Sequence, residues 1–418
     1  MNAKSMTMVA VLGLAAQTFA AVTITNVTCQ QRYPWNGLVD IDYEIQSDDA
    51  EAQYFVYPKG EDRRLGERII MHTLMGDGAT NAVGVGKHRM IWDAKADMPN
   101  FHTPDFAVTL QTIAQGAQYL VIDLSGGTNA VTYPVRYSTT PPDITTDKCR
   151  TTELWLRLIL PGTFMMGSPT TESGRGSNEQ QHSVRLTRPY YIGVFEITQK
   201  QWMLVSGTTN AICHVGDCRP VDRVSYNMIR GSNIGSQWPV SDAVDVDSFV
   251  GVMRHKTSLK FDLPTEAQWE YACRAGTTSA LNNGGGTEND MKKVGRYWGN
   301  TSDGRESYSQ HTKVGVYLPN TWGLYDMHGN VSEWCRDLYQ AQLPEHEVVD
   351  PVGSANLGGQ RCWRGGAWNI GSWGTWTCCR SAARSSASPS TTRVNFSNDE
   401  AQHQQGNTGF RVVCLPIE

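Results

Sequence analysis

A strict alternation of apolar and polar residues runs through the first third of the chain. Residues 39–45 read Val-Asp-Ile-Asp-Tyr-Glu-Ile, and residues 106–111 read Phe-Ala-Val-Thr-Leu-Gln. A period of two places successive side chains on opposite faces of a strand, so each segment has one buried face and one face in water. Further strand candidates, separated by clusters of Gly, Asn, Asp and Pro, are residues 54–57, 90–92 and 119–124. Several short strands of this kind predict an all-β domain over residues 21–138, an antiparallel sandwich of immunoglobulin-like type that serves as a spacer or binding module.

A polar stretch without periodicity follows at residues 139–152, and it contains Thr139-Thr140-Pro141-Pro142. This composition is typical of linkers, so a second domain is expected over residues 153–418. That domain has few helical patterns, while the whole chain holds 40 Gly and 13 Trp. The mixture favours a turn-rich fold with irregular packing.

Two short helices are predicted in the second domain, at residues 263–273 and 198–206. In the first, the side chain of Thr265 is expected to cap the opening turn while Gln268 reaches back to it. Apolar residues that share one face of this helix are predicted to be buried. They are Trp269, Ala272 and Cys273. In the second helix, the expected buried residues are Trp202 and Val205.

The first twenty residues have the features of a secretory signal peptide. Lys4 gives a positive start, residues 6–16 form an apolar run, and small residues precede a cleavage site after Ala20. A buried N-terminal helix is the alternative, and the run is too short to span a bilayer. The protein is therefore expected to be secreted, periplasmic or on the cell surface, without a membrane span. Lys and Arg total 36 against 41 Asp and Glu. This net charge of -5 does not indicate the basic surface that a nucleic-acid-binding protein needs.

Export changes how the ten cysteines are interpreted, because disulfides persist in oxidising compartments. Cys213 and Cys218 close a short loop, in which a local disulfide is the simpler interpretation. A zinc site with His214 as third ligand is the alternative, but no second Cys/His pair follows at a suitable spacing. The pairing of the remaining cysteines does not follow from the sequence.

An ordered series of phrases runs through residues 153–418. They are Pro-Gly-Thr-Phe-Met-Met-Gly-Ser at 161–168, Pro-Tyr-Tyr-Ile at 189–192, Leu-Pro-Thr-Glu-Ala-Gln-Trp-Glu-Tyr at 263–271, Gly-Leu-Tyr-Asp-Met-His-Gly-Asn-Val-Ser-Glu-Trp at 323–334, Arg-Gly-Gly-Ala-Trp at 364–368 and Gly-Phe-Arg at 409–411. Together they resemble the formylglycine-generating enzyme (sulfatase-modifying factor) family. The resemblance implies a C-type-lectin-like α+β domain that is rich in loops, and it does not extend to the N-terminal domain.

One of these phrases predicts a metal site. Asp326 and Glu333 lie seven residues apart around a Gly-Asn turn, and such a turn can aim backbone carbonyls and two acids at a hard cation. A plain turn, whose acids face solvent or pair with arginine, is the alternative. The resemblance implies structural calcium, held by the side chains of Asp326 and Glu333 and by the carbonyls of Gly329 and Val331. His328 is expected to be a turn residue without a catalytic role.

The family enzyme oxidises a sulfatase cysteine to formylglycine with dioxygen and binds copper(I) through two thiolates. The corresponding positions in this chain are Ile370 and Trp376, so the soft ligands that copper(I) requires are missing there. Cys378 and Cys379 lie nearby, but adjacent cysteines do not reproduce the family's spacing. We therefore predict a pseudoenzyme without copper, with a ligand-binding or accessory role. An active formylglycine-generating oxidase is the alternative.

The same stretch is rich in tryptophan. Aromatic rings beside amides and hydroxyls suit sugars and extended peptides. Trp363 and Trp368 are expected to fill the core. The predicted contacts for a peptide, protein or glycan ligand are Trp373, Trp376, Asn369 and Ser372. A purely structural surface component is a third interpretation.

Overall fold

The computed structural model describes residues 22–69, 71, 73–79, 81–99, 103, 105–209, 214–301, 310–353, 359–369, 375–392 and 407–416. The chain divides into two compact units. The first contains the residues up to Gln118, with Arg136–Thr140 and the last three residues, and the second contains Tyr119–Val135 and Pro141–Leu415. The predicted signal peptide at 1–20 lies outside the described residues. Among those residues, no helix has the length and apolar character needed to cross a membrane.

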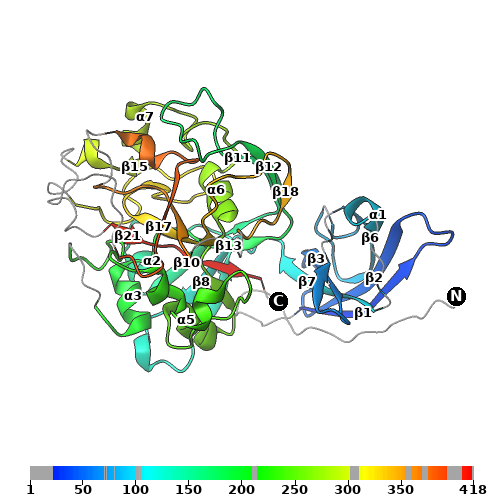
Figure 1. The fold of residues 1–418 in the computed structure, drawn as a ribbon. Helices are drawn as coiled ribbons and strands as arrows, with labels where there is room; N and C mark the ends of the chain where they lie inside the picture. The colour runs from blue at the N-terminus through cyan, green and yellow to red at the C-terminus, as the bar shows by residue number, and fades with distance from the viewer. Residues whose placement is uncertain are drawn as a thin grey trace. The chain divides into compact units, whose positions relative to one another are not determined.

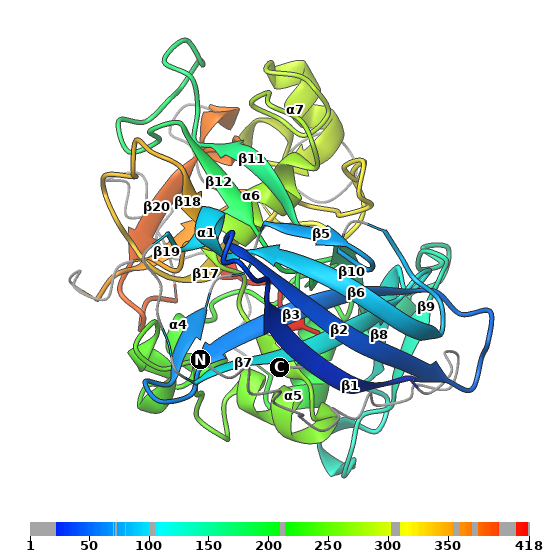
Figure 2. The same ribbon diagram turned by 90° about the vertical axis from the view of Figure 1, so that its right-hand side faces the viewer.

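The first unit consists, as far as it is described, of two antiparallel sheets. One has the strand order β1-β2-β6-β5, and these strands lie side by side in Figure 2. The other has the order β4-β3-β7. The elements are β1 (Val22–Gln31), β2 (Leu38–Ser47), β3 (Tyr54–Asp62), β4 (Glu67–Ile69), β5 (Leu74–Gly76), β6 (Gly86–Asp93), α1 (Ala94–Asp97) and β7 (Phe106–Ala114).

Apolar residues from both sheets of the first unit form one core. It includes Ile41 of β2 and Val56 of β3. Trp92 of β6 stacks on Phe106 of β7 with ring centroids 5.4 Å apart, and so joins the two sheets. Along β2 every second residue is buried from Val39 to Ile45, as the period of two predicts.

The second unit begins earlier in the chain than the sequence suggested. β8 (Tyr119–Asp123) pairs with β10 (Glu153–Ile159) and therefore belongs to the sheet of the second unit. Four of its five residues are buried, because both faces of this strand are covered. The stretch 139–152, expected to be a linker, contains the helix α2 (Lys148–Thr151), whose two central residues are buried. The expected division into 21–138, 139–152 and 153–418 thus differs from the division in the structure.

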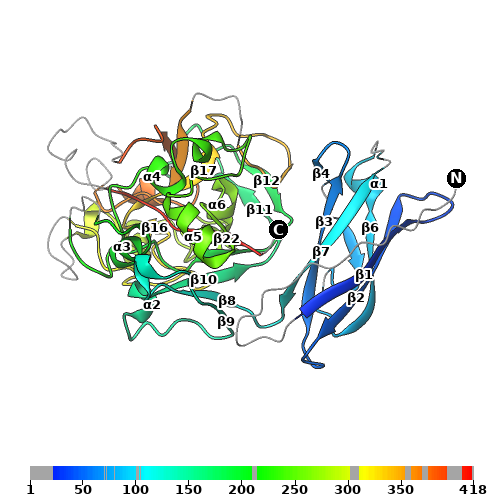
Figure 3. The same cartoon turned by 90° about the horizontal axis from the view of Figure 1, so that it is seen from below.

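A sheet with the order β14-β22-β13-β10-β8-β9 lies at the centre of the second unit. Helices α3 and α5 lie below it in Figure 1 and toward the viewer in Figure 3, and they pack together through Trp202 stacked on Phe249 at 5.3 Å. Helix α6 lies above the sheet in Figure 1 and shares a core with it, in which Trp269 and Ile192 both take part. Smaller sheets have the orders β11-β12-β18, β15-β16 and β20-β19-β17-β21.

Strand β9 (Val135–Ser138) begins at the boundary between the two units. The remaining elements of the second unit are η1 (Gly127–Asn129), β11 (Gly162–Met166), β12 (His182–Leu186), β13 (Tyr190–Gly193), α3 (Gln199–Ser206), α4 (Tyr226–Arg230), η2 (Ile234–Gln237), α5 (Phe249–Thr257), β14 (Lys260–Asp262), α6 (Glu266–Arg274), α7 (Glu288–Val294), β15 (Gly295–Arg296), η3 (Trp298–Asn300), β16 (His328–Gly329), β17 (Ser332–Leu338), β18 (Val348–Val349), β19 (Arg361–Arg364), η5 (Trp376–Cys379), β20 (Arg384–Ala387), β21 (Thr408–Gly409) and β22 (Val413–Leu415).

Both predicted helices are confirmed. At the start of α6 the Thr265 side chain accepts from the Gln268 amide, and the Gln268 side chain accepts from the Thr265 amide at 2.9 Å. The residues predicted to be buried on α6 are indeed in the core. Helix α3 likewise buries Trp202 and Val205.

Candidate functional site

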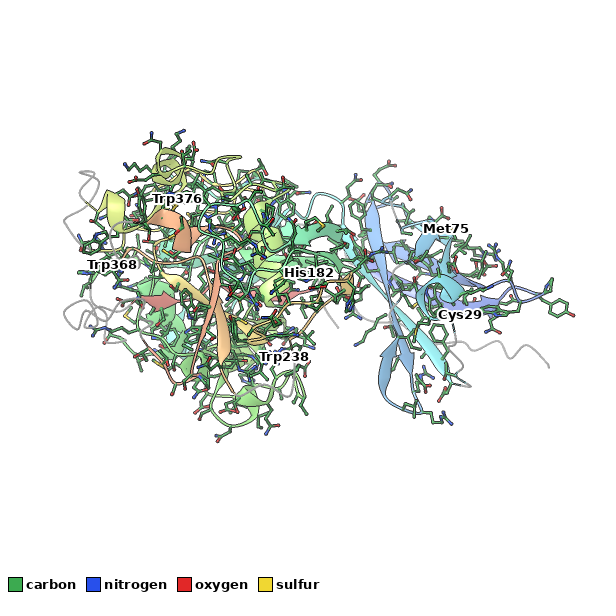
Figure 4. The ribbon with its side chains drawn as sticks, turned by 45° about the horizontal axis from the view of Figure 1, so that its top comes forward. Cys29, Met75, His182, Trp238, Trp368 and Trp376 are labelled. Atoms are coloured by element: carbon green, nitrogen blue, oxygen red, sulfur yellow. The ribbon has the colours of Figure 1, made fainter. Side chains whose placement is uncertain are left out.

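A cavity of about 300 Å³ opens in the second unit beside the helical turn η5. Its wall includes the indole of Trp376, which Figure 4 labels, and the hydroxyl-bearing residues Ser173, Thr278 and Ser279. Trp376 also packs against a buried cluster that contains Leu281, so the indole is anchored in the unit while it lines the cavity. A volume of this size lies at the lower end of the range of small-ligand sites.

Three consecutive glycines, Gly284, Gly285 and Gly286, form another part of the wall. A Cβ atom at Gly284 would meet no atom within 4 Å, and one at Gly286 would meet only the Ala280 side chain, at 3.9 Å. Gly284 has a φ of +83°, a conformation that favours glycine. At this wall the backbone itself therefore reaches the cavity, without side chains to block it.

Glu172 is the charged residue of the wall, and it is already paired. Arg380 donates from Nη1 to Glu172 at 2.5 Å and to Glu179 at 2.9 Å. Because Arg380 is 1% exposed, this pair is largely shielded from water. The cavity thus offers hydroxyls, backbone groups and an indole, and its acid, Glu172, forms an ion pair with Arg380.

The structure describes two of the four predicted ligand contacts. Trp376 lines the cavity, whereas Asn369 is not among the residues that line it. Trp373 and Ser372 lie outside the described residues. Trp363 and Trp368 are 4% and 0% exposed, which confirms that they fill the core.

Most of the cavity wall was missed at the sequence level. Glu172, Thr278 and Ser279 lie in loops that no periodic pattern marks. The signal that was available is compositional: the run Gly284-Gly285-Gly286 follows closely after Thr277-Thr278-Ser279.

The turn expected to hold calcium is buried, and its two acids have different surroundings. Both oxygens of Glu333 accept from Arg411, with Nε 2.7 Å from Oε2 and Nη2 2.8 Å from Oε1. The indole of Trp269 also donates to Oε2, at 2.9 Å. Asp326 accepts from the Gly315 amide through Oδ2 at 2.6 Å, while its buried Oδ1 has no hydrogen-bond partner among the described residues.

A third acid completes this buried group. Glu196 accepts from the Asn330 side chain at 2.6 Å and from the Val331 amide at 3.0 Å. Burial, then the charges of Asp326 and Glu333, raise the pKa of Glu196 well above its usual range. Burial also raises the pKa of Asp326 to about 6.

Glu333 thus pairs with arginine, as the plain-turn alternative expected. Because Arg411 engages both of its oxygens, Glu333 as it is arranged does not offer an unshared oxygen to a calcium ion. Within the described part of the chain, no group of three or more His, Cys, Asp or Glu side chains is placed to hold a metal ion. Calcium binding stays a prediction.

His328 is buried and hydrogen-bonded through both ring nitrogens. Nδ1 donates to the Cys379 carbonyl at 2.7 Å, and Nε2 accepts from the Asn282 amide at 3.1 Å. Burial lowers the pKa of His328 to about 4. The neutral ring therefore links three segments of the unit and has a structural role.

No disulfide links the nine cysteines that the structure describes. Cys213, the expected partner of Cys218, lies outside the described residues, and so does Ile370 at the first copper position. Trp376, which the resemblance aligns with the second copper position, is one of the residues that line the cavity.

These features define a class of protein: a two-sheet β module followed by a loop-rich α+β unit with a polar cavity. A family model described as the sulfatase-modifying factor enzyme 1-like domain matches residues 142–415. The chain belongs to this family, as the resemblance of its phrases predicted.

Several curated proteins are similar to parts of the chain. Chaperone protein LppX of Paenibacillus barcinonensis is 33% identical over 185 residues, which make up 38% of this chain and 65% of that protein. The formylglycine-generating enzyme of Bos taurus is 30% identical over 175 residues, 40% of this chain and 39% of the enzyme. That of Thermomonospora curvata is 30% identical over 167 residues, 37% of this chain and 50% of the enzyme. The chain thus spans less than two thirds of the length of these relatives.

Two solved structures are similar in arrangement. PvdO from Pseudomonas aeruginosa has a TM-score of 0.48 at 24% identity, covering 62% of this chain and 94% of that one. Treponema denticola variable protein 1 has a TM-score of 0.47 at 25% identity, covering 63% of this chain and 96% of that one.

Proposed function

We propose that this protein is an exported, non-oxidase member of the family that binds a polar ligand, a peptide, protein or glycan, in the cavity beside η5. One observation carries the proposal. Trp376, which the resemblance aligns with the second copper thiolate of the family enzyme, forms part of the wall of this cavity. An indole provides an apolar face for a ligand and cannot supply the soft sulfur that copper(I) requires.

The chemistry of the wall supports a polar ligand. Thr278 and Ser279 bring hydroxyls, the glycine run brings backbone groups, and Trp376 provides a flat face. Convergent polar groups around an aromatic face are typical of sites that select a ligand by shape and hydrogen bonding. Glu172 is paired with Arg380, which it shares with Glu179, so this carboxylate is not free to hold a cationic ligand by itself.

The first unit belongs to the same proposal as a spacer or second binding module. Its two antiparallel sheets around one core support an immunoglobulin-like type. Export is supported by the features of residues 1–20, and places the protein in the periplasm, on the cell surface or outside the cell.

Glycan and peptide arrays probed with the purified protein test the proposal. We expect a small set of hits, all lost in Trp376→Ala and in Gly286→Leu, whose side chain would enter the open space in front of Gly286. Trp35→Ala is the matched control, because Trp35 is 53% exposed and lies in the first unit. Hits that persist in both cavity variants, or that only Trp35→Ala removes, would place the binding elsewhere.

The alternative is an active oxidase that converts a sulfatase cysteine to formylglycine. Relatives named formylglycine-generating enzyme, 30% identical to parts of this chain, favour it. It requires a metal arrangement other than the family's cysteine pair, because the two aligned positions hold Ile370 and Trp376.

A further inference from the structure

We infer that Cys378 and Cys379 form a redox-active dithiol, which a small or protein disulfide converts into a disulfide between these adjacent residues. The inference needs no ligand in the cavity and so stands apart from the proposed function. It rests on the distance between the two sulfur atoms, on their unequal burial and on how the surrounding residues hold them.

The two thiols are already close. Their Sγ atoms lie 3.9 Å apart within the turn η5, and Cys378 Sγ also lies 3.6 Å from the Thr375 carbonyl. A disulfide has an S–S length of about 2.05 Å, so an approach of about 2 Å is needed. Rotation of the partly exposed Cys378 side chain with a local change in the turn can supply it.

The two cysteines have different access to water. Cys378 is partly exposed, whereas Cys379 is buried. The hydrogen bond between the thiols lowers the pKa of Cys378 and raises that of Cys379 well above its usual range. The accessible sulfur is therefore the better thiolate, and thiolates rather than thiols attack disulfides.

Other partly exposed cysteines in the described residues lack this combination. Burial raises the pKa of Cys29, which Figure 4 labels, to about 12, and that of Cys218 to about 11. Partial exposure alone therefore does not make a cysteine of this protein a good thiolate. Among the described residues, Cys378 differs from Cys29 and Cys218 because a second thiol lies next to it.

The buried thiol is held in place by the surrounding unit. His328 donates to the Cys379 carbonyl at 2.7 Å. A Cβ atom at Gly366 would lie 2.6 Å from Cys379 Sγ and 2.9 Å from the Cys378 carbonyl, so the absence of a side chain there leaves room for the pair.

The reaction has two exchange steps. The Cys378 thiolate attacks one sulfur of a disulfide such as glutathione disulfide, forms a mixed disulfide and releases one glutathione thiolate. Cys379 then loses its proton to solvent and attacks Cys378 Sγ, which expels the second thiolate. Two thiols of the protein are oxidised, and one disulfide of the oxidant is reduced to two thiols.

The product is expected to be easily reduced. Adjacent Cα atoms are about 3.8 Å apart, which is shorter than the separation in ordinary disulfides. Departures from the usual geometry make a disulfide more reducible. The pair therefore suits reversible oxidation better than permanent cross-linking.

The test is a thiol map of the intact folded protein after treatment with glutathione disulfide. Remaining thiols are alkylated, the protein is digested with trypsin, and the peptide 365–380, which holds both cysteines, is weighed. We expect this peptide to lose two hydrogens, to take up no alkyl label and to recover both thiols with dithiothreitol. Cys29 is the internal control and should remain fully alkylated.

Two variants separate the steps. Cys379→Ser should trap glutathione on Cys378, because no second thiol is left to displace it. Cys378→Ser should leave Cys379 as an unreacted thiol. If Cys379→Ser fails to fold, Cys379→Ala takes its place. The inference is overturned if wild type keeps both thiols, if it retains glutathione on Cys378, or if Cys29 reacts as fast as Cys378.

Discussion

Asp337 in β17 shows how burial sets the charge of a single residue in this protein. Its side chain accepts from the Glu266 amide at 2.8 Å and lies in the core of the second unit. Burial, then the charge of Glu266, raises the pKa of Asp337 from 3.8 to about 7. The folded protein therefore holds this proton over a pH range in which the unfolded chain releases it.

The pH dependence of unfolding tests this assignment. Between about pH 4 and pH 7 the folded state binds a proton that the unfolded state lacks, so the free energy of unfolding falls as pH rises. The pKa difference of about 3 units corresponds to about 4 kcal/mol across that range. Asp337→Asn should make this slope in urea unfolding curves shallower by the share of Asp337, whereas the exposed Asp48→Asn should leave it unchanged, and the buried acids Asp326 and Glu196 account for the slope that remains. Equal slopes in wild type and Asp337→Asn would contradict the assignment.

Individual elements differed in how well the sequence predicted them. Helices α3 and α6 were predictable because capping residues and buried faces follow local spacing. β8 was assigned to the wrong unit because an apolar run does not state which strand it pairs with, and its partner β10 lies beyond an intervening loop. The cavity was not predictable as a whole, since its wall is assembled from separate loops.

The turn between β16 and β17 gives two opposed predictions for calcium. The resemblance predicts that calcium raises the melting temperature above that of EDTA-treated protein, because a ligand bound only by the folded state stabilises it. The geometry, in which Arg411 already engages Glu333, predicts equal melting temperatures. Melting curves in excess calcium and in EDTA decide between them, with Asp326→Asn as the control that removes a calcium effect at this turn.

At the scale of the whole molecule, the pairing of β8 with β10 moves the start of the second unit to Tyr119. A chain that starts at residue 142, where the family model begins, lacks this strand and leaves the edge of β10 unpaired. We expect it to melt at a lower temperature and to aggregate more than a chain that starts at residue 118. Equal melting temperatures would show that β8 contributes little to the second unit.

The family was recognisable from ordered phrases, but the function was not, because the phrases describe the scaffold. Buried pairs such as Glu333–Arg411 join residues far apart in the chain and depend on the fold.

Incubation with a sulfatase-type peptide tests the central claim most directly. Purified protein is given a Cys-X-Pro-X-Arg peptide with copper(I) and dioxygen, and the peptide is weighed over time beside a formylglycine-generating enzyme as positive control. Our account predicts that the peptide keeps its thiol, since Trp376 replaces a copper ligand. Formation of the aldehyde by this protein would contradict it.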